Sequence, residues 1–319
     1  MRMGTVCVIV TLASSCATTL KSKPIAQVKP ELKKKEYVSY DGDHFGYKKW
    51  LPAKEPVKTV IIGVHGISGH AGDYDNLGGF LQKHAQSAAL YAAETRGQGR
   101  DPKAERRGDI HKAKEWTKDL YTFTDLVRAL YPKAKVVWFG ESMGSLIVMN
   151  AYSNTPLGSK KPDAMVISSP IANLQSKVAG WKVNALRVAT FLIPTLRISL
   201  ESLSSGEKAQ VTQQDIHKEQ SAKNEWYIPR YTLRLLMELG DLAESMPTLA
   251  KQVRCPVLVL HGGNDIFTSK ESVEGFYQHF PDTISKERKY YAEAYHLLMY
   301  DENRDQIFKD AAAWVSELK

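Results

Sequence analysis

A serine, an aspartate and a histidine each follow an apolar segment of the chain, in the order Ser142, Asp265, His296. A serine hydroxyl is a weak nucleophile until a histidine accepts its proton. A carboxylate then orients the imidazole and stabilises its charged form. A fold that brings these three side chains together could cleave acyl bonds through a covalent intermediate.

Ser142 lies in the pattern Gly140-x-Ser142-x-Gly144, between apolar runs at 136–139 and 146–149. The serine thus falls where a buried strand is expected to turn into a helix. This is the context of a nucleophile elbow, in which the serine backbone is strained and its neighbours must be small. A tight turn into which small residues simply fit is the alternative, and the strand–turn–helix context favours the nucleophile.

The base and its carboxylate partner each have rivals in the sequence. His279 and His296 follow Asp265, but His279 lies in a charged helical pattern, whereas His296 comes soon after an expected strand. Asp265 ends another apolar strand behind two glycines, although an aspartate there could also simply form the turn. Asp282 and Asp301 lie in polar turns with no strand before them. We therefore favour His296 as the base and Asp265 as its partner.

The negative charge that develops on the substrate carbonyl oxygen needs two fixed N–H donors. In an elbow of this type, one donor is the backbone of the residue after the nucleophile, here Met143. The loop after an early strand, 59–64, supplies the other, and His65-Gly66 places Ile67 in that position. Only backbone groups are used, so both side chains are free to vary.

Apolar strands alternate with helical segments from about residue 37 to the end of the chain. This alternation predicts an α/β fold with a mostly parallel, doubly wound sheet. Ligands in such sheets bind beyond the carboxyl ends of the strands, which is where the candidate residues fall. Residues 171 to about 246 interrupt the alternation with a strongly apolar, mostly helical stretch, which we interpret as a cap over the site.

The net charge of +8 does not indicate a nucleic-acid partner. Seven basic residues and one acidic residue lie within positions 1–35, so this stretch carries +6 and the remaining 284 residues carry about +2. The apolar fraction of 43% is ordinary for a globular protein. The histidines are scattered, without metal-ligand spacing, so neither a metal nor another cofactor is expected.

The N-terminus has the pattern of an export signal, with Arg2, an apolar stretch at 5–13 and small residues after it. The apolar stretch is too short to span a membrane. The sequence ASSC at 13–16 resembles a bacterial lipobox with Cys16 as the lipidated residue, although Ala13 replaces the usual Leu, Val or Ile. We expect a membrane-anchored lipoprotein; a periplasmic or secreted protein and an uncleaved terminus are the alternatives. Residues 1–16 would be the signal, 17–36 a Lys/Pro-rich linker, and 37–319 the folded domain.

Several stretches resemble the α/β-hydrolase superfamily and, within it, the monoacylglycerol lipase and lysophospholipase group. They are VHGISGHAGDYDNL at 64–77, TRGQGRD at 95–101, GESMGS at 140–145, EAYHLLMYD at 293–301, and the apolar cap sequence at 182–199. Ser145 stands where the group usually has glycine. The resemblance covers about residues 38–319. It implies the α/β-hydrolase fold, a triad of Ser142, Asp265 and His296, and an oxyanion hole formed by Ile67 and Met143.

We therefore expect a serine hydrolase that cleaves carboxylic esters of one medium or long acyl chain through an acyl-enzyme. A peptidase or amidase on the same fold is the alternative, because the fold alone does not decide the substrate. A non-catalytic exported binding protein is less expected, since all three reactive residues are present. Trp181, Leu186 and Phe191 of the cap are candidates to contact an acyl chain or a membrane surface, or else they pack on the body below.

Overall fold

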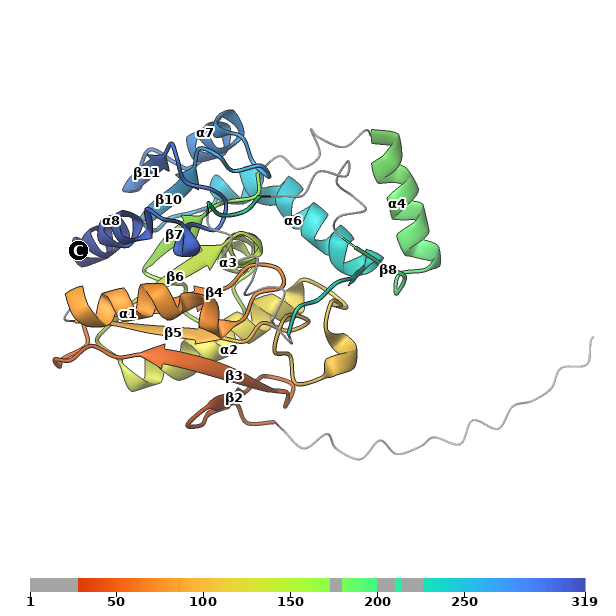
Figure 1. Ribbon diagram of the computed structural model, residues 1–319. Helices are drawn as coiled ribbons and strands as arrows, with labels where there is room; N and C mark the ends of the chain where they lie inside the picture. The colour runs from red at the N-terminus through yellow and green to blue at the C-terminus, as the bar shows by residue number, and fades with distance from the viewer. Residues whose placement is uncertain (1–27, 86, 173–179, 200–209, 214–225, 319) are drawn as a thin grey trace, which may run out of the picture.

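A central sheet with helices on both faces forms the body of the molecule (Figure 1). The computed structural model describes residues 28–85, 87–172, 180–199, 210–213 and 226–318. Within them the sheet runs in the order β1-β2-β3-β5-β4-β6-β7-β10-β11. These strands are β1 (Glu31–Leu32), β2 (Glu36–Val38), β3 (His44–Trp50), β4 (Thr59–Val64), β5 (Ala88–Ala93), β6 (Lys135–Glu141), β7 (Ala164–Ser168), β10 (Val257–Gly262) and β11 (Lys286–Tyr291).

From β5 to β11 in this order, adjacent strands are parallel to one another, whereas the pairs β1–β2, β2–β3 and β3–β5 are antiparallel. All six residues of β4 are buried, as expected of a strand covered on both faces. Because the strands run in one direction, the loops after β4, β6 and β10 open at one edge of the sheet. The predicted mostly parallel sheet is confirmed.

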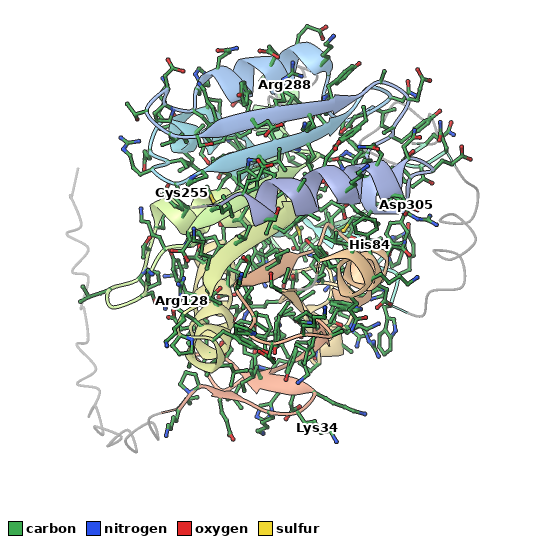
Figure 2. All side chains as sticks on the ribbon, turned by 90° about the vertical axis from the view of Figure 1, so that its left-hand side faces the viewer. Lys34, His84, Arg128, Cys255, Arg288 and Asp305 are labelled. Carbon is green, nitrogen blue, oxygen red and sulfur yellow. The ribbon has the colours of Figure 1, made fainter. Side chains whose placement is uncertain are left out.

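Helices α1 (Asp75–His84) and α8 (Arg304–Ser316) cover one face of the sheet, and Phe80 contacts Phe308 between them. Figure 2 labels His84 at the end of α1 and Asp305 near the start of α8. The other face carries α2 (Lys114–Leu130), α3 (Met143–Ser153), α6 (Leu233–Ala250) and α7 (Lys270–Gln278). In α2 the buried residues Trp116, Leu120, Phe123 and Val127 recur at helical spacing and form its inward stripe.

The segment between β7 and β10 holds α4 (Gly180–Leu192), β8 (Arg197–Ile198), β9 (Tyr231–Thr232) and α6, with α4 projecting from the body (Figure 1). Strands β8 and β9 form a separate antiparallel pair. Arg187 of α4 forms ion pairs with Asp241 and Glu244 of α6, at 3.5 and 3.4 Å. Among the described helices, none is long and apolar enough to cross a membrane.

The side chains expected to line the cap differ in their surroundings. Phe191 is 87% exposed, so it does not pack on the body below. Leu186 is half-buried. Trp181 belongs to α4, but its side chain lies outside the described residues, as does Cys16. Phe191 and its neighbours Val188 and Leu192, at 61% and 68% exposure, present an apolar surface on α4.

The expected linker ends earlier than the sequence suggested. Glu31 and Leu32 pair with Val38 and Tyr37, which adds β1 to the sheet inside the range 17–36. Such a two-residue strand gives no periodic signal, so the sequence alone could not reveal it.

Candidate active site

Ser142 occupies a strained turn between β6 and α3, with φ 53° and ψ −116°. Its glycine neighbours explain how the turn fits. A Cβ at Gly140 would lie 2.4 Å from the carbonyl oxygen of Gly144, and a Cβ at Gly144 would lie 1.9 Å from that of Val64. The two glycines therefore let α3 approach both β6 and the end of β4, and the strained serine stands at their junction.

Replacing Gly144 with alanine is expected to destabilise the fold by about 3 kcal/mol, because the added methyl group would overlap backbone atoms rather than a mobile side chain. Gly275 of α7 is the matched control, since a Cβ there meets no atom within 4 Å. Gly275→Ala should stabilise its helix by about 0.5–1 kcal/mol. Urea unfolding of both variants measures the difference. Equal stabilities would contradict this account of the turn.

His296 lies between Ser142 and Asp265. Its Nε2 is 2.8 Å from the Ser142 Oγ, and its Nδ1 is 2.8 Å from Oδ2 of Asp265. All three side chains are buried. With Asp265 ionised, Nδ1 carries the imidazole proton, which leaves Nε2 to accept the hydrogen bond from the serine hydroxyl. The structure thus brings together the three residues that the sequence singled out.

Asp265 is held as a carboxylate. Burial alone would raise its pKa, but the hydrogen bond from His296 and those from the N–H groups of Phe267 and Thr268 lower the pKa below its ordinary value. A fixed negative charge at this position favours an imidazolium at His296 when that ring accepts a proton.

The rival residues have other positions. Asp282 is exposed and pairs with Lys286, while His279 follows the last residue of α7. Asp301 is buried and accepts a hydrogen bond from the N–H of Tyr295, at 2.8 Å. It therefore supports the loop that carries His296, a role that a polar turn in the sequence does not signal.

The expected oxyanion donors also lie beside Ser142. Met143 is the first residue of α3, so its N–H has no acceptor within the helix. A Cβ on Gly66 would be 3.4 Å from the Cβ of Ser142, which places the loop that carries Ile67 directly against the serine. This arrangement is suited to binding a negatively charged oxygen, and the roles of Ile67 and Met143 stay predictions.

Tyr74 and His65 fix the loops around the serine, and neither received a role from the sequence. The hydroxyl of Tyr74 lies 2.7 Å from the carbonyl oxygen of Phe139 and 3.0 Å from that of Val64, so it joins the ends of β6 and β4. His65 accepts a hydrogen bond from the N–H of Thr95 on Nε2. Burial lowers the pKa of His65, which keeps the ring neutral and able to accept. Both residues belong to the sequence stretch that resembles the family, and this resemblance was the one sign in the sequence that they have a role at the site.

Glu141, directly before Ser142, is fully buried. Burial raises its pKa to about 8, the nearby Asp73 carboxylate adds to this shift, and a hydrogen bond from the Met299 N–H opposes it. Its Oε1 has no hydrogen-bond partner within the described part of the chain. Near neutral pH this side chain is therefore largely a neutral acid.

Replacing Glu141 with glutamine is expected to flatten the dependence of stability on pH. The unfolded carboxyl ionises near 4.5, whereas the folded one keeps its proton to about 8. Between these values the unfolded state binds fewer protons, so the wild type loses up to about 1.4 kcal/mol of unfolding free energy per pH unit through this group. Urea unfolding from pH 5 to pH 8 measures both proteins. Parallel stability curves would contradict the assignment.

Among the described residues, no three His, Cys, Asp or Glu side chains are grouped as they would be around a metal ion.

A family model described as serine aminopeptidase, S33, matches residues 55–303, which is most of the chain. The chain belongs to this family of α/β-hydrolases. The α/β-hydrolase is 26% identical to a monoacylglycerol lipase of Mycolicibacterium smegmatis, across 88% of this chain and 95% of that protein. It is 25% identical to a monoglyceride lipase of Rattus norvegicus, across 88% and 89%. It spans 28% of the length of an uncharacterised abhydrolase domain-containing protein of Dictyostelium discoideum, at 23% identity.

The crystal structure of a Paleococcus ferrophilus monoacylglycerol lipase superposes with a TM-score of 0.70 and 22% identity, across 86% of this chain and 99% of that one. The predicted fold and the resemblance to monoacylglycerol lipases are therefore confirmed. The family model and the lipase relatives also confirm the predicted enzyme class, a serine ester hydrolase.

Proposed function

We propose that this α/β-hydrolase cleaves carboxylic esters of a single medium or long acyl chain, with Ser142 as nucleophile, His296 as base and Asp265 as the carboxylate that orients it. The observation that carries the proposal is the continuous pair of 2.8 Å contacts from Ser142 through His296 to Asp265. The strained backbone of Ser142 supports the same role, because strain of this kind collects at functional sites.

In the proposed mechanism, the Ser142 oxygen attacks the ester carbonyl carbon while His296 Nε2 takes the hydroxyl proton. The carbonyl electrons move onto oxygen, where the N–H groups of Ile67 and Met143 stabilise the charge. Collapse of this intermediate breaks the bond to the alcohol, which leaves with the proton from His296. Water, deprotonated by His296, then attacks the acyl-enzyme and releases the fatty acid and Ser142.

Two considerations support an acyl ester as substrate. The relatives named above include monoacylglycerol lipases, and the cap carries apolar side chains of a kind that bind hydrocarbon. The family description, serine aminopeptidase, favours the second candidate, a peptidase or amidase on the same scaffold. A purely binding role would leave the hydrogen-bonded arrangement of the three buried side chains without a purpose.

A substrate panel separates these candidates. The purified protein is first labelled with a fluorophosphonate probe. It is then offered p-nitrophenyl esters from acetyl to palmitoyl, monoacylglycerols, and aminoacyl anilides. Labelling with turnover that is best on medium or long esters is the expected result. Turnover of anilides without esters would replace the proposal with a peptidase, and a folded protein that resists labelling would remove the catalytic proposal.

We also propose that the enzyme works at a membrane surface, held there by a lipid on Cys16 and by the apolar surface of α4. Phe191→Ser should lower the rate on monoacylglycerol in vesicles by about tenfold, because it removes a large apolar side chain from that surface. The rate on a soluble short ester should stay unchanged. An equal loss on both substrates would instead place Phe191 in the substrate pocket. Mass spectrometry of membrane-extracted protein tests the lipid on Cys16.

A further inference from the structure

Ser68 lies beside the expected oxyanion donor Ile67, at a point where three segments of the chain meet. Its backbone has φ 59°, in the left-handed region that disfavours residues with side chains. Such a conformation persists only where surrounding contacts hold it. The N–H of Ser68 donates to Oε1 of Gln98 at 3.0 Å, and its hydroxyl forms a hydrogen bond with the hydroxyl of Tyr231. The proposed acyl transfer uses neither contact.

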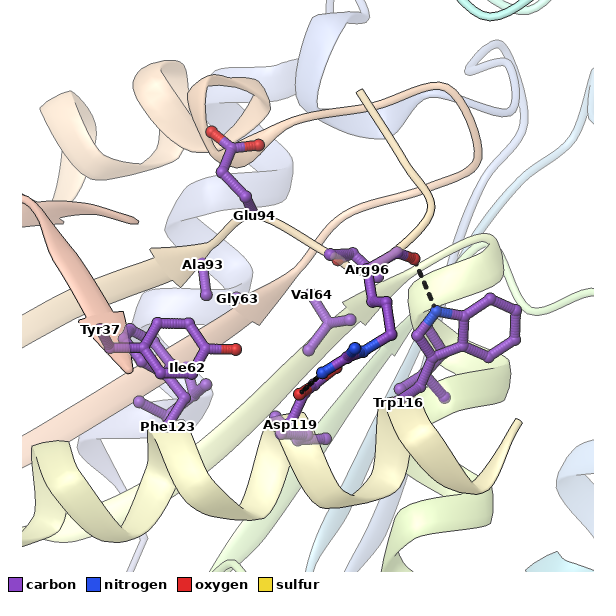
Figure 3. A pocket seen from close by; sticks show the side chains of 13 residues that line it. Tyr37, Ile62, Gly63, Val64, Ala93, Glu94, Arg96, Trp116, Asp119 and Phe123 are labelled. Carbon is purple, nitrogen blue, oxygen red and sulfur yellow. Dashed lines mark hydrogen bonds and ion pairs between the residues drawn. The ribbon is translucent and has the colours of Figure 1, made fainter. Parts of the chain in front are cut away.

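The Gln98 contact fixes Ser68 to the body of the enzyme. A Cβ on Gly99 would lie 2.2 Å from the carbonyl oxygen of Gly69, so the turn after β5 packs directly on the loop that carries Ile67. Arg96 anchors this turn, because its guanidinium binds Asp119 and its carbonyl accepts a hydrogen bond from the indole of Trp116, at 2.9 Å (Figure 3). Arg96, Trp116 and Asp119 also line a small cavity of about 30 Å³.

The Tyr231 contact comes from the cap. Tyr231 belongs to β9, which pairs with β8 and leads directly into α6. The side chain of Tyr231 is 1% exposed, so its hydroxyl has a defined place rather than a choice of solvent partners. The next residue, Thr232, caps α6 by accepting a hydrogen bond from the N–H of Leu235. The N–H of Thr232 also donates to the carbonyl oxygen of Gly108 at 2.8 Å, and its hydroxyl donates to Asp109 at 2.7 Å, so this end of the cap has a fixed position on the body.

We propose that Tyr231 is a positioning residue that couples the cap to the oxyanion hole. Its hydroxyl holds Ser68 in the left-handed conformation and thereby fixes, one residue away, the direction of the Ile67 N–H. This inference rests on the proposed ester hydrolysis, because the N–H of Ile67 is an oxyanion donor in that mechanism.

Tyr231→Phe removes only the hydroxyl and retains the buried ring. Complete loss of an oxyanion donor lowers kcat by about 10²- to 10³-fold, so a donor that is only loosened should lower kcat by about tenfold. KM should stay unchanged, because the hydroxyl holds the loop and not the substrate. Ser68→Ala breaks the same hydrogen bond from the opposite side and should have the same effect, and the double variant should be no worse than either single one.

The experiment uses the full chain and a soluble short ester, p-nitrophenyl butyrate. Endpoint titration with a fluorophosphonate gives the concentration of active sites, so that kcat is corrected for any unfolded fraction, and thermal unfolding gives Tm. Tyr227→Phe is the matched control, because Tyr227 lies in the chain shortly before β9 but is 49% exposed. Its kcat and KM should equal those of the wild type.

A fall in kcat at constant KM in both Tyr231→Phe and Ser68→Ala supports the coupling. Unchanged kcat in both variants, or additive losses in the double variant, would overturn it. A rise in KM alone would also overturn it, since Tyr231 would then contact substrate. If Tyr231→Phe does not fold, Ser68→Ala decides by the same criteria. A wild type that neither reacts with the probe nor turns over ester contradicts the proposed function itself, whereas an active wild type with unaltered variants contradicts only the coupling.

Discussion

Replacing Ser142 with alanine is expected to lower kcat for ester hydrolysis by on the order of 10⁶-fold and to abolish labelling by a fluorophosphonate. The hydroxyl that would form the acyl-enzyme is 2.8 Å from its base, and alanine leaves that base without a nucleophile to activate. The loss should appear in kcat, because the substitution leaves the other groups of the site in place. Single-turnover kinetics and gel detection of the labelled protein measure the two effects.

Ser153 provides the control for this variant. It lies at the end of the same helix, α3, and its hydroxyl has no hydrogen-bond partner within the described residues. Ser153→Ala should retain wild-type kcat, labelling and Tm. Labelling that persists in Ser142→Ala would show that another residue is the nucleophile.

Asp265→Asn is expected to lower kcat by about 10⁴-fold while the protein stays folded. The asparagine amide can donate a hydrogen bond to Nδ1 of His296, which favours the tautomer with its proton on Nε2. That tautomer cannot accept the Ser142 proton, although the positions of the atoms barely change. The measurement is kcat across neutral pH together with Tm.

Asp282→Asn is the matched substitution for this test, since Asp282 is the exposed rival carboxylate and forms an ion pair with Lys286. It should leave kcat unchanged. A similar loss in both variants would point to a general effect of charge, and an unaffected Asp265→Asn enzyme would remove Asp265 from the mechanism.

The residues at the strand ends were predictable because their neighbours reveal the elements that carry them. The apolar run before Ser142 and the helix after it define a turn with few alternatives, and the glycines at 140 and 144 report how closely α3 approaches. His296 and Asp265 could be chosen over His279 and Asp282 for the same reason. In each case a local pattern determines where the side chain lies in a parallel sheet.

Individual side-chain contacts of the folded protein could not be predicted in this way. Nothing near Asp301 in the sequence shows that its carboxylate supports Tyr295, and nothing near Ser68 identifies Tyr231 as its partner. The exposure of Phe191 could not be predicted either, because the sequence of an apolar helix does not show whether the helix packs on the body or projects from it. These features depend on tertiary packing, which hydrophobic periodicity does not encode.

The Tyr74 hydroxyl, which joins the ends of β4 and β6, has a consequence for how such an enzyme can change over generations. It keeps the nucleophile and the neighbouring loop at a constant separation through atoms that belong entirely to the body. Mutations in the cap can therefore accumulate and change which substrates bind, while the distance between the reacting groups stays the same. Tyr231 would be an exception within the cap, because its replacement would alter the loop that carries Ile67.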